Sequence, residues 1–121
     1  MLRPLEAIWI FDETIRPPGP KMIVCIEPAR GFFFRINTSA KWQTPVRLDP
    51  AHHPFLDHVS HLECGDPLEI DDYVIDQSLR RRGVIGRIDP RHIPEILAAV
   101  EKARTLSAAD KSAIRAALAA L

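Results

Sequence analysis

The distribution of proline constrains the fold of this 121-residue chain more than any other feature of its sequence. Nine of the eleven prolines lie within residues 1–67, and the other two are Pro90 and Pro94. Proline has no backbone N–H and interrupts both helix interiors and central strands. We therefore expect short strands joined by turns in the first part of the chain, and helices only near its end.

Short runs of apolar, β-branched and aromatic residues fill the spaces between these prolines. The runs that predict strands are Glu6–Phe11, Lys21–Ile26, Gly31–Ile36, Val46–Leu48 and Val59–Glu63, with Leu68–Ile70 as a short extension of the same sheet. The second and third runs predict an antiparallel hairpin that turns at Ala29–Gly31. Because both runs are apolar almost throughout, we expect both sheet faces to be covered, as in a small closed barrel rather than an open one-sided sheet.

Three segments after residue 70 carry helix signals. Residues 71–82 predict a short helix that is capped by Asp71 or Asp72 and ends in arginines before Gly83. Asp89-Pro90 predicts the start of a second helix, and Ser107 with Asp110 resembles a capping box that opens a third. The apolar faces of these last two helices are Ile93, Ile96, Leu97 and Val100 in one, and Ile114, Leu118 and Leu121 in the other.

The predicted architecture is a single α+β domain over residues 1–121, a small antiparallel β-barrel with two C-terminal α-helices. Residues 1–70 are mostly barrel, and residues 71–121 supply the short helix, a strand and the two C-terminal helices. A chain of this length buries about two thirds of the surface that its unfolded form exposes. It therefore needs no disulfide or metal to fold.

Charge, hydropathy and cysteine content limit the function. The formal net charge is zero, but residues 1–79 hold seven Lys and Arg against twelve Asp and Glu, and residues 80–121 hold nine against four. The basic end is the candidate for anion contact, although solvated helix faces give the same pattern. No apolar run reaches the length of a signal peptide or of a ~20-residue membrane span, so we expect a cytoplasmic protein. In that compartment we expect Cys25 and Cys64 to be reduced and buried.

The sequence gives little support for metal or classical nucleophile chemistry. Imidazole and thiolate suit zinc, but His58 and His61 are three apart on a predicted strand and face opposite sides of it. The chain has no Gly-x-Ser-x-Gly, no Gly-rich phosphate loop and no Cys-x-x-Cys. We therefore expect neither a metal nor a cofactor.

The region from residue 58 to residue 103 contains an ordered series of short motifs. They are Ser60 on a strand, Ile70-Asp71, the arginines Arg80–Arg82, Ile85-Gly86-Arg87-Ile88, and the helix after Asp89-Pro90. This order is similar to the C-terminal half of the MazF/PemK-type toxin family, and residues 6–27 are similar to that family in outline. The resemblance implies an SH3-like barrel, a homodimer, a cognate antitoxin as partner, and metal-independent cleavage of single-stranded RNA.

The resemblance also implies roles for particular side chains. Arg16 or Lys21 would stabilise the charge that develops on the phosphate, and Thr38, Ser60 or His61 would assist. Ser39 is an alternative to Thr38. The triple arginine, Arg80, Arg81 and Arg82, would contact the RNA backbone. Bases could stack on the run Phe32–Phe34, although we expect at least one or two of its rings to lie in the core.

A different function is compatible with the same barrel. Where the family has Arg-Pro leading directly into a strand, this chain has Gly19-Pro20-Lys21, and Arg16-Pro17 comes several residues earlier. The alternative is a non-catalytic interaction module that binds a protein through the Pro-rich loop and the terminal helices. The clustered arginines favour the ribonuclease. The absence of Arg-Pro directly before the second strand favours the interaction module.

Overall fold

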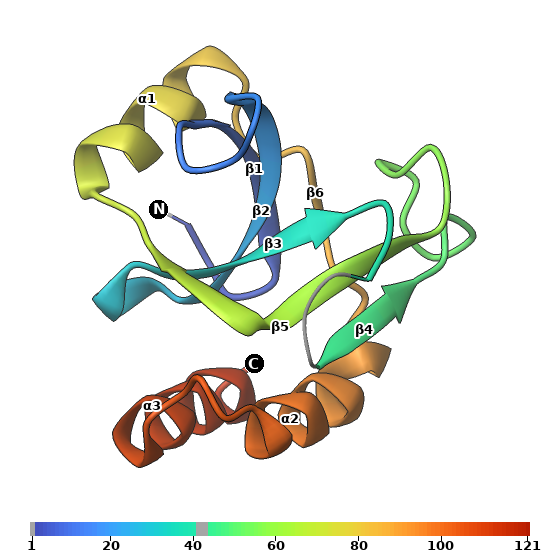
Figure 1. Cartoon of the computed structure of the whole chain (residues 1–121), viewed down its shortest axis with the longest axis vertical. Coiled ribbons are helices and arrows are strands. Elements are labelled where there is room, and N and C mark those ends of the chain that lie inside the picture. The colour runs from blue at the N-terminus through green and yellow to red at the C-terminus, as the bar shows by residue number, and fades with distance from the viewer. Residues whose placement is uncertain (1, 41–43) are drawn as a thin grey trace.

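The computed structural model of the protein describes residues 2–40 and 44–121, and its strands form one curled antiparallel sheet flanked by helices (Figure 1). The strands are β1 (Glu6–Asp12), β2 (Gly19–Glu27), β3 (Phe32–Asn37), β4 (Pro45–Leu48), β5 (Ser60–Glu69) and β6 (Gly86–Arg87). The helices are α1 (Asp72–Arg81), α2 (Ile93–Lys102) and α3 (Ala108–Ala119), with 3₁₀ turns at Pro28–Arg30 and Pro90–His92. None of these helices is long and apolar enough to cross a membrane.

The predicted α+β class and the order of elements are confirmed. All the described strands except β6 lie before residue 70, and the α-helices lie after it, as the prolines indicate. The β2–β3 hairpin turns where expected, and Gly31 at its corner has a φ of +65°, a left-handed conformation that favours glycine. One prediction was incomplete, because Val59–Glu63 and Leu68–Ile70 belong to a single long strand, β5.

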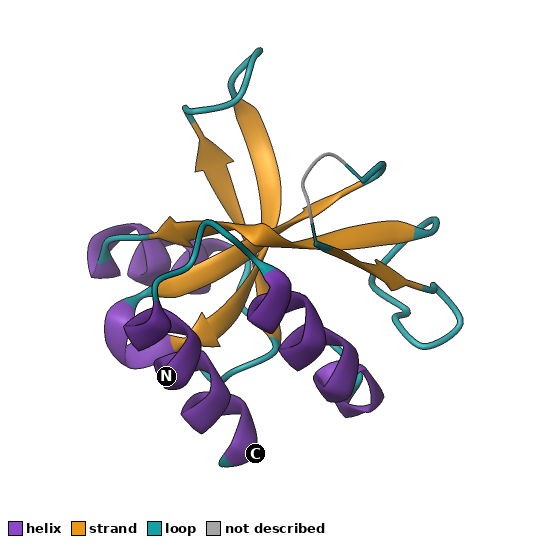
Figure 2. Ribbon diagram, turned by 60° about the horizontal axis from the view of Figure 1, so that its bottom comes forward, coloured by secondary structure: helices purple, strands orange, loops and turns teal. Residues whose placement is uncertain are grey.

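The expected closed barrel is replaced by a strongly curled half-barrel. The strand order is β4-β5-β3-β2-β1-β6, so β4 and β6 are the two outer strands of the sheet that the structure describes. Helices α2 and α3 pack on one face of the sheet and α1 on the other, as Figures 1 and 2 show. Helices therefore cover both faces of the central strands, and the sheet does not need to close on itself.

Two hydrophobic cores explain why the central run Met22–Ile26 of β2 and the run Phe32–Phe34 of β3 are continuously apolar. The larger core lies between the sheet and α2 and α3, and it includes Val24, Phe34 and Ile96. The smaller core lies under α1 and includes Ile23 and Phe33. Neighbouring residues of one strand thus enter different cores, because successive side chains of a strand point to opposite faces.

The ends of the C-terminal helices differ in detail from the sequence prediction. Ser107 caps α3 and accepts a hydrogen bond from the Asp110 backbone N–H at 3.1 Å, as expected. The Asp110 carboxylate pairs instead with Arg30 at 2.7 Å, so the reciprocal half of the capping box is absent from this cap. Leu121, which we expected on the apolar stripe, lies beyond the helix and is 48% exposed.

The glycine-containing motif of residues 85–88 forms the last strand. Ile85 and Ile88 each donate a backbone hydrogen bond to the N-terminal segment, and Gly86 pairs with Ala7 of β1. A Cβ atom on Gly86 would lie 2.1 Å from Cδ1 of Phe55, so only glycine lets that ring pack against β6. Through the contact of Phe55 with Gly86, the motif therefore holds the loop of residues 49–59 against the sheet.

A buried ion cluster joins three strands beside the β1–β2 hairpin. Arg35 of β3 donates to Asp12 of β1 at 2.9 Å and pairs with Asp66 of β5. It also donates to the Thr14 hydroxyl at 2.7 Å, and Thr14 donates to Asp12 through both its hydroxyl and its backbone N–H. Burial alone would raise the pKa of Asp12, but the Thr14 hydrogen bonds and the Arg35 charge outweigh it, and the pKa is lowered.

Candidate functional site: two pockets beside the first hairpin

The β1–β2 hairpin leaves the sheet beyond its point of contact with β3. The pairing of β2 with β3 ends at Ile23–Arg35, whereas β1 and β2 remain paired to Asp12–Gly19. Figure 2 shows the freed arm of the hairpin projecting from the rest of the sheet. A pocket lies on each side of this arm, and Trp9 and Pro20 line both pockets.

The first pocket, which we call the loop-side pocket, has a volume of about 300 Å³. It lies between β2, the end of β3 and the loop that precedes β5. It brings together three of the side chains that sequence predicted as catalytic, Lys21, Thr38 and Ser60. The remaining lining residues are Trp9, Pro20, Met22, Ile36, Asn37, Phe55, Leu56, Asp57 and His58.

A cation and a hydroxyl both line the loop-side pocket. The Lys21 ammonium donates a hydrogen bond to the side-chain oxygen of the buried Asn37. Thr38 follows Asn37 in the chain and is exposed. An ammonium and a hydroxyl in one pocket can both donate hydrogen bonds to the oxygens of a phosphate.

His58 adds a base on the other wall of the same pocket. The Ser60 hydroxyl donates to the His58 carbonyl oxygen at 3.1 Å and lies 3.3 Å from His58 Nδ1. His58 Nδ1 is 3.0 Å from the Val59 carbonyl oxygen, which can only accept, so Nδ1 carries the proton. In the neutral imidazole, Nε2 of the exposed His58 is then the nitrogen that can accept a proton from a ligand.

Sequence reasoning considered His58 only as a zinc ligand and missed it as a base. The sequence feature that could have placed His58 in the site is its spacing from Ser60, because residues two apart on an extended segment lie on the same face. Among the described residues, no group of three or more His, Cys, Asp or Glu side chains is arranged to hold a metal ion.

Two of the predicted catalytic residues lie outside the loop-side pocket. Arg16 is exposed in the turn of the hairpin, where its guanidinium donates to the carbonyl oxygens of Glu13 and Ile15. His61 follows Ser60 on β5 and therefore faces the opposite side of the sheet. Its Nδ1 is buried and has no hydrogen-bond partner in the part of the chain that the structure describes.

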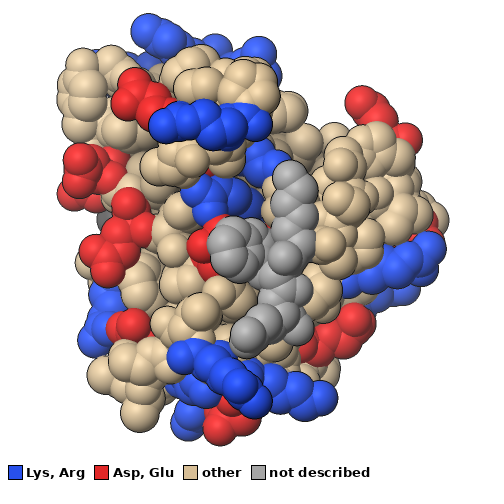
Figure 3. All heavy atoms as spheres, in the orientation of Figure 1, with Lys and Arg blue, Asp and Glu red and all other residues tan. Residues whose placement is uncertain are grey.

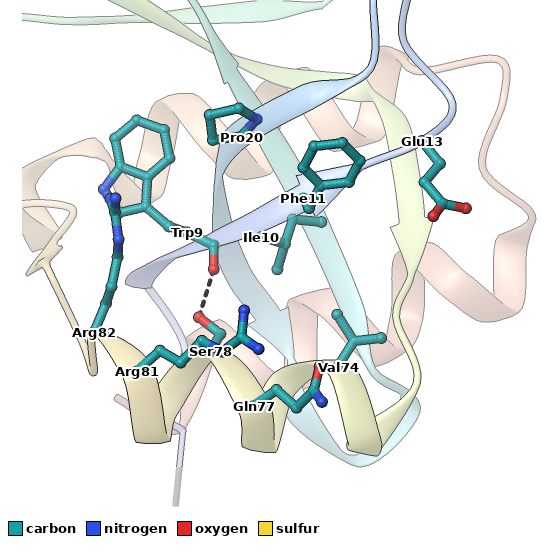
Figure 4. Close-up of a pocket in the computed structure, with 10 residues that line it drawn as sticks. All are labelled: Trp9, Ile10, Phe11, Glu13, Pro20, Val74, Gln77, Ser78, Arg81 and Arg82. Carbon is teal, nitrogen blue, oxygen red and sulfur yellow. Dashed lines mark hydrogen bonds between the residues drawn. The ribbon is translucent and has the colours of Figure 1, made fainter.

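The second pocket, which we call the helix-side pocket, has a volume of about 340 Å³ and lies between the hairpin and α1 (Figure 4). The Arg82 guanidinium carbon is 5.4 Å from the centre of the Trp9 ring, a cation–π contact. The Ser78 hydroxyl donates to the Trp9 carbonyl oxygen and ties α1 to β1. The other lining residues are Ile10, Phe11, Glu13, Pro20, Val74, Gln77 and Arg81.

The aromatic rings that border the two pockets lie on the hairpin and in the loop before β5, and not on β3. All three rings of Phe32–Phe34 are buried in the two cores, so the prediction that some of them offer stacking faces is wrong. On the hairpin, Phe11 is 62% exposed and Trp9 is partly exposed. Phe55 of the loop also lines the loop-side pocket, whereas the exposed Tyr73 of α1 lines neither pocket.

The three consecutive arginines differ in their surroundings. Arg81 and Arg82 line the helix-side pocket, whereas Arg80 is exposed on α1 and does not. Figure 3 shows Lys and Arg side chains at the end of the molecule formed by α1 and the hairpin, and also at the opposite end and along one side. Of the basic residues in 80–121, Arg81 and Arg82 line the helix-side pocket.

The two cysteines cannot serve as thiolate nucleophiles at neutral pH. Both are buried and free. Burial raises the pKa of Cys25 to about 12 and raises the pKa of Cys64 as well. The prediction that both are small buried thiols is confirmed.

A buried histidine anchors the loop that carries His58. His53 Nδ1 is 2.8 Å from the Asp49 carbonyl oxygen, and His53 Nε2 accepts the Asp89 backbone N–H at 3.1 Å. The ring also stacks on His92 with centroids 5.2 Å apart. Because Nδ1 donates and Nε2 accepts, the imidazole is neutral, and burial lowers its pKa below the usual 6.5.

We expect this anchor to make stability depend on pH. The unfolded chain binds a proton at His53 near pH 6.5, whereas the folded chain resists protonation. The contribution of His53 is therefore fully present above pH 6.5 and is lost as the pH falls below it, by at most about 1.4 kcal/mol per pH unit. His53→Gln, which keeps a donor and an acceptor but does not titrate, should flatten the fall in melting temperature between neutral and mildly acidic pH. His52→Gln, at the exposed neighbour, should keep the parental profile, and equal profiles for all three proteins would contradict the assignment.

Comparison of the chain with protein-family models, with curated proteins and with solved structures found no match.

Proposed function

We propose that this protein is a metal-independent endoribonuclease of the MazF/PemK type, which cleaves single-stranded RNA in the loop-side pocket. One observation carries the proposal. Lys21, Thr38 and Ser60 come from three separate parts of the chain, and they line one pocket together with His58. The pocket thus combines a cation, hydroxyl groups and a base, the groups that phosphodiester transfer requires.

Each side chain has a role in a balanced reaction. The 2′-hydroxyl of the RNA attacks the adjacent phosphorus, the bond from phosphorus to O2′ forms, and the bond from phosphorus to O5′ breaks. His58 Nε2 takes the proton of the 2′-hydroxyl, and the leaving O5′ takes a proton from solvent. The Lys21 ammonium and the Thr38 hydroxyl donate to the non-bridging phosphate oxygens, on which negative charge develops.

Ser60 acts as a positioning residue. Its hydroxyl is buried and bonded to the His58 carbonyl, so it holds the segment that presents the imidazole. Asn37 has the same relation to Lys21, because its side-chain oxygen fixes the ammonium.

The test is incubation of the purified protein with single-stranded RNA in EDTA. We expect cleavage fragments that end in a 2′,3′-cyclic phosphate, and no cleavage of the same sequence with 2′-O-methyl groups, because the nucleophile is then blocked. RNA that stays intact, or fragments that lack the cyclic phosphate, would reject this mechanism. If the RNA stays intact and the protein instead binds another protein through its terminal helices, the interaction module is favoured. The homodimer and the antitoxin remain predictions of the resemblance.

A further inference from the structure

We infer that the helix-side pocket is a subsite for unpaired bases of single-stranded RNA, which stack on Trp9 and Phe11 while Arg81 and Arg82 contact the phosphates. This inference rests on the proposed function, because it extends the RNA path beyond the pocket where cleavage would occur. It adds a binding site and a mode of recognition to the reaction.

The hairpin presents flat apolar surfaces along one side of this pocket. Trp9 and Phe11 are two residues apart on β1, so their side chains leave the same face of the strand about 7 Å apart. Ile10 between them points toward α1, and the two rings border the pocket from the face of β1 that points away from the helix (Figure 4). Pro20 pairs with Phe11 across the hairpin, and Figure 4 shows it between the two rings. Stacking on such rings is tolerant of sequence, because every base has a π face.

Helix α1 and the residue after it supply positive charge, which is opposite to the charge of an RNA backbone. Arg81 and Arg82 come from the last turn of α1 and the residue that follows it, and they face the hairpin across the pocket. Neither forms an ion pair with any residue that the structure describes, so neither charge is neutralised within the chain. The cation–π contact of Arg82 holds its guanidinium beside the Trp9 ring, where a stacked base would place its phosphate.

The pocket also carries groups that suit a base edge. Glu13 and Gln77 line it as well. A carboxylate repels phosphate but accepts hydrogen bonds from the amino and imino groups of a base. The distribution of charge therefore favours bases toward the hairpin and phosphates toward α1, and it disfavours an acidic peptide that would meet Glu13.

The two pockets form one path because they share a wall. Trp9 and Pro20 border both the helix-side pocket and the loop-side pocket. An RNA chain that places a phosphate at Lys21 reaches the helix-side pocket by passing the Trp9 ring. An RNA duplex cannot follow this path, because its bases are paired and stacked inside the helix.

The experiment measures binding of a fluorescent single-stranded 2′-O-methyl RNA, which cannot be cleaved. Phe11→Ala should weaken binding about tenfold, the loss of one stacked base. Tyr73→Ala is the matched control, since Tyr73 is an aromatic residue of α1 that is 70% exposed and lies outside the pocket. The salt dependence is measured as the slope of the logarithm of the binding constant against the logarithm of the salt concentration. Arg81→Ala should reduce the size of this slope by about 0.7, and Arg80→Ala should change it less. A strand that carries abasic sugars should bind more weakly than the parent strand.

The outcomes separate this subsite from the ribonuclease proposal. If the parent protein cleaves RNA but Phe11→Ala and Arg81→Ala bind as the parent does, the subsite is wrong and the cleavage site stands. If abasic and normal strands bind equally, stacking is rejected. If Phe11→Ala weakens binding while no RNA is cleaved, the subsite stands without catalysis. If no single strand binds, or only a protein partner occupies the pocket, the inference is overturned.

Discussion

Replacement of Arg35 by methionine should lower the free energy of unfolding by about 3–5 kcal/mol, a large fraction of the 5–15 kcal/mol that stabilises a typical domain. Methionine has a similar length but no charge, so the buried Asp12 would lose its cationic partner. Asp66 would lose this partner as well, and only the Thr14 hydrogen bonds would remain to stabilise the charge of Asp12. Urea denaturation followed by circular dichroism measures the change.

The loss should depend on pH in a defined direction. In the parent protein the pKa of Asp12 is lowered from 3.8, so its contribution to stability is present above that pH and is lost as the pH falls. Without Arg35, the pKa of Asp12 should be higher than in the parent protein, because the hydrogen bond and the positive charge of Arg35 no longer lower it, and acid then removes the charge that has lost its partner. The difference between parent and variant should therefore shrink as the medium becomes acidic.

Two further variants make the Arg35 prediction specific. Arg47→Met removes an exposed arginine from the neighbouring part of the sheet and should change stability by less than about 0.5 kcal/mol. Asp12→Asn in the Arg35→Met background should recover part of the loss, since the two residues are directly paired. Equal effects of Arg35→Met and Arg47→Met would show that the buried cluster does not join the strands as described.

Replacement of Lys21 by methionine should reduce RNA cleavage by about 10²–10³-fold, the usual cost of removing one preorganised donor to developing charge. The effect should fall on kcat more than on KM, because the charge on the phosphate oxygens grows as the transition state forms. Single-turnover cleavage with saturating protein measures the chemical step directly.

Arg16→Ala is the matched control for Lys21. Both residues are cations of the β1–β2 hairpin region, but Arg16 donates to carbonyl oxygens of its own loop and lines neither pocket. We expect it to retain cleavage within a few-fold of the parent. If Arg16→Ala lost more cleavage activity than Lys21→Met, Arg16 at the tip of the hairpin would be the catalytic cation, and the proposed site would be wrong.

Much of the fold could be predicted because local patterns and tertiary packing agree. The continuous apolar runs Met22–Ile26 of β2 and Phe32–Phe34 of β3 indicate two covered faces, and the structure has a hydrophobic core on each. The continuity of β5 could not be predicted, because Gly65-Asp66-Pro67 is typical of a turn. Distant partners hold this segment extended: Asp66 pairs with Arg35, and the Thr105 hydroxyl donates to the Gly65 carbonyl at 2.6 Å.

The candidate site was partly predictable for a related reason. Lys21, Thr38 and Ser60 could be identified as candidates from residue type and order, and they line one pocket. The aromatic side of the hairpin could not, because Trp9 and Phe11 read as core residues of a strand. Their exposure depends on where β2 separates from β3, which is a property of sheet curvature and is not encoded in the local alternation of residues.

The packing of Phe55 against Gly86 has a consequence for the order in which the proposed site is assembled. During synthesis the hairpin and β3 emerge first, but the loop that carries His58 has no seat until Gly86 has joined β1. Pairings between distant parts of a chain also form slowly, because the entropy of closing the loop is lost before the contact is made. A nascent chain still attached to the ribosome therefore carries Lys21 and Thr38 without the finished pocket. For the proposed ribonuclease, this order of assembly would delay cleavage until residues 86–87 have left the ribosome and joined β1.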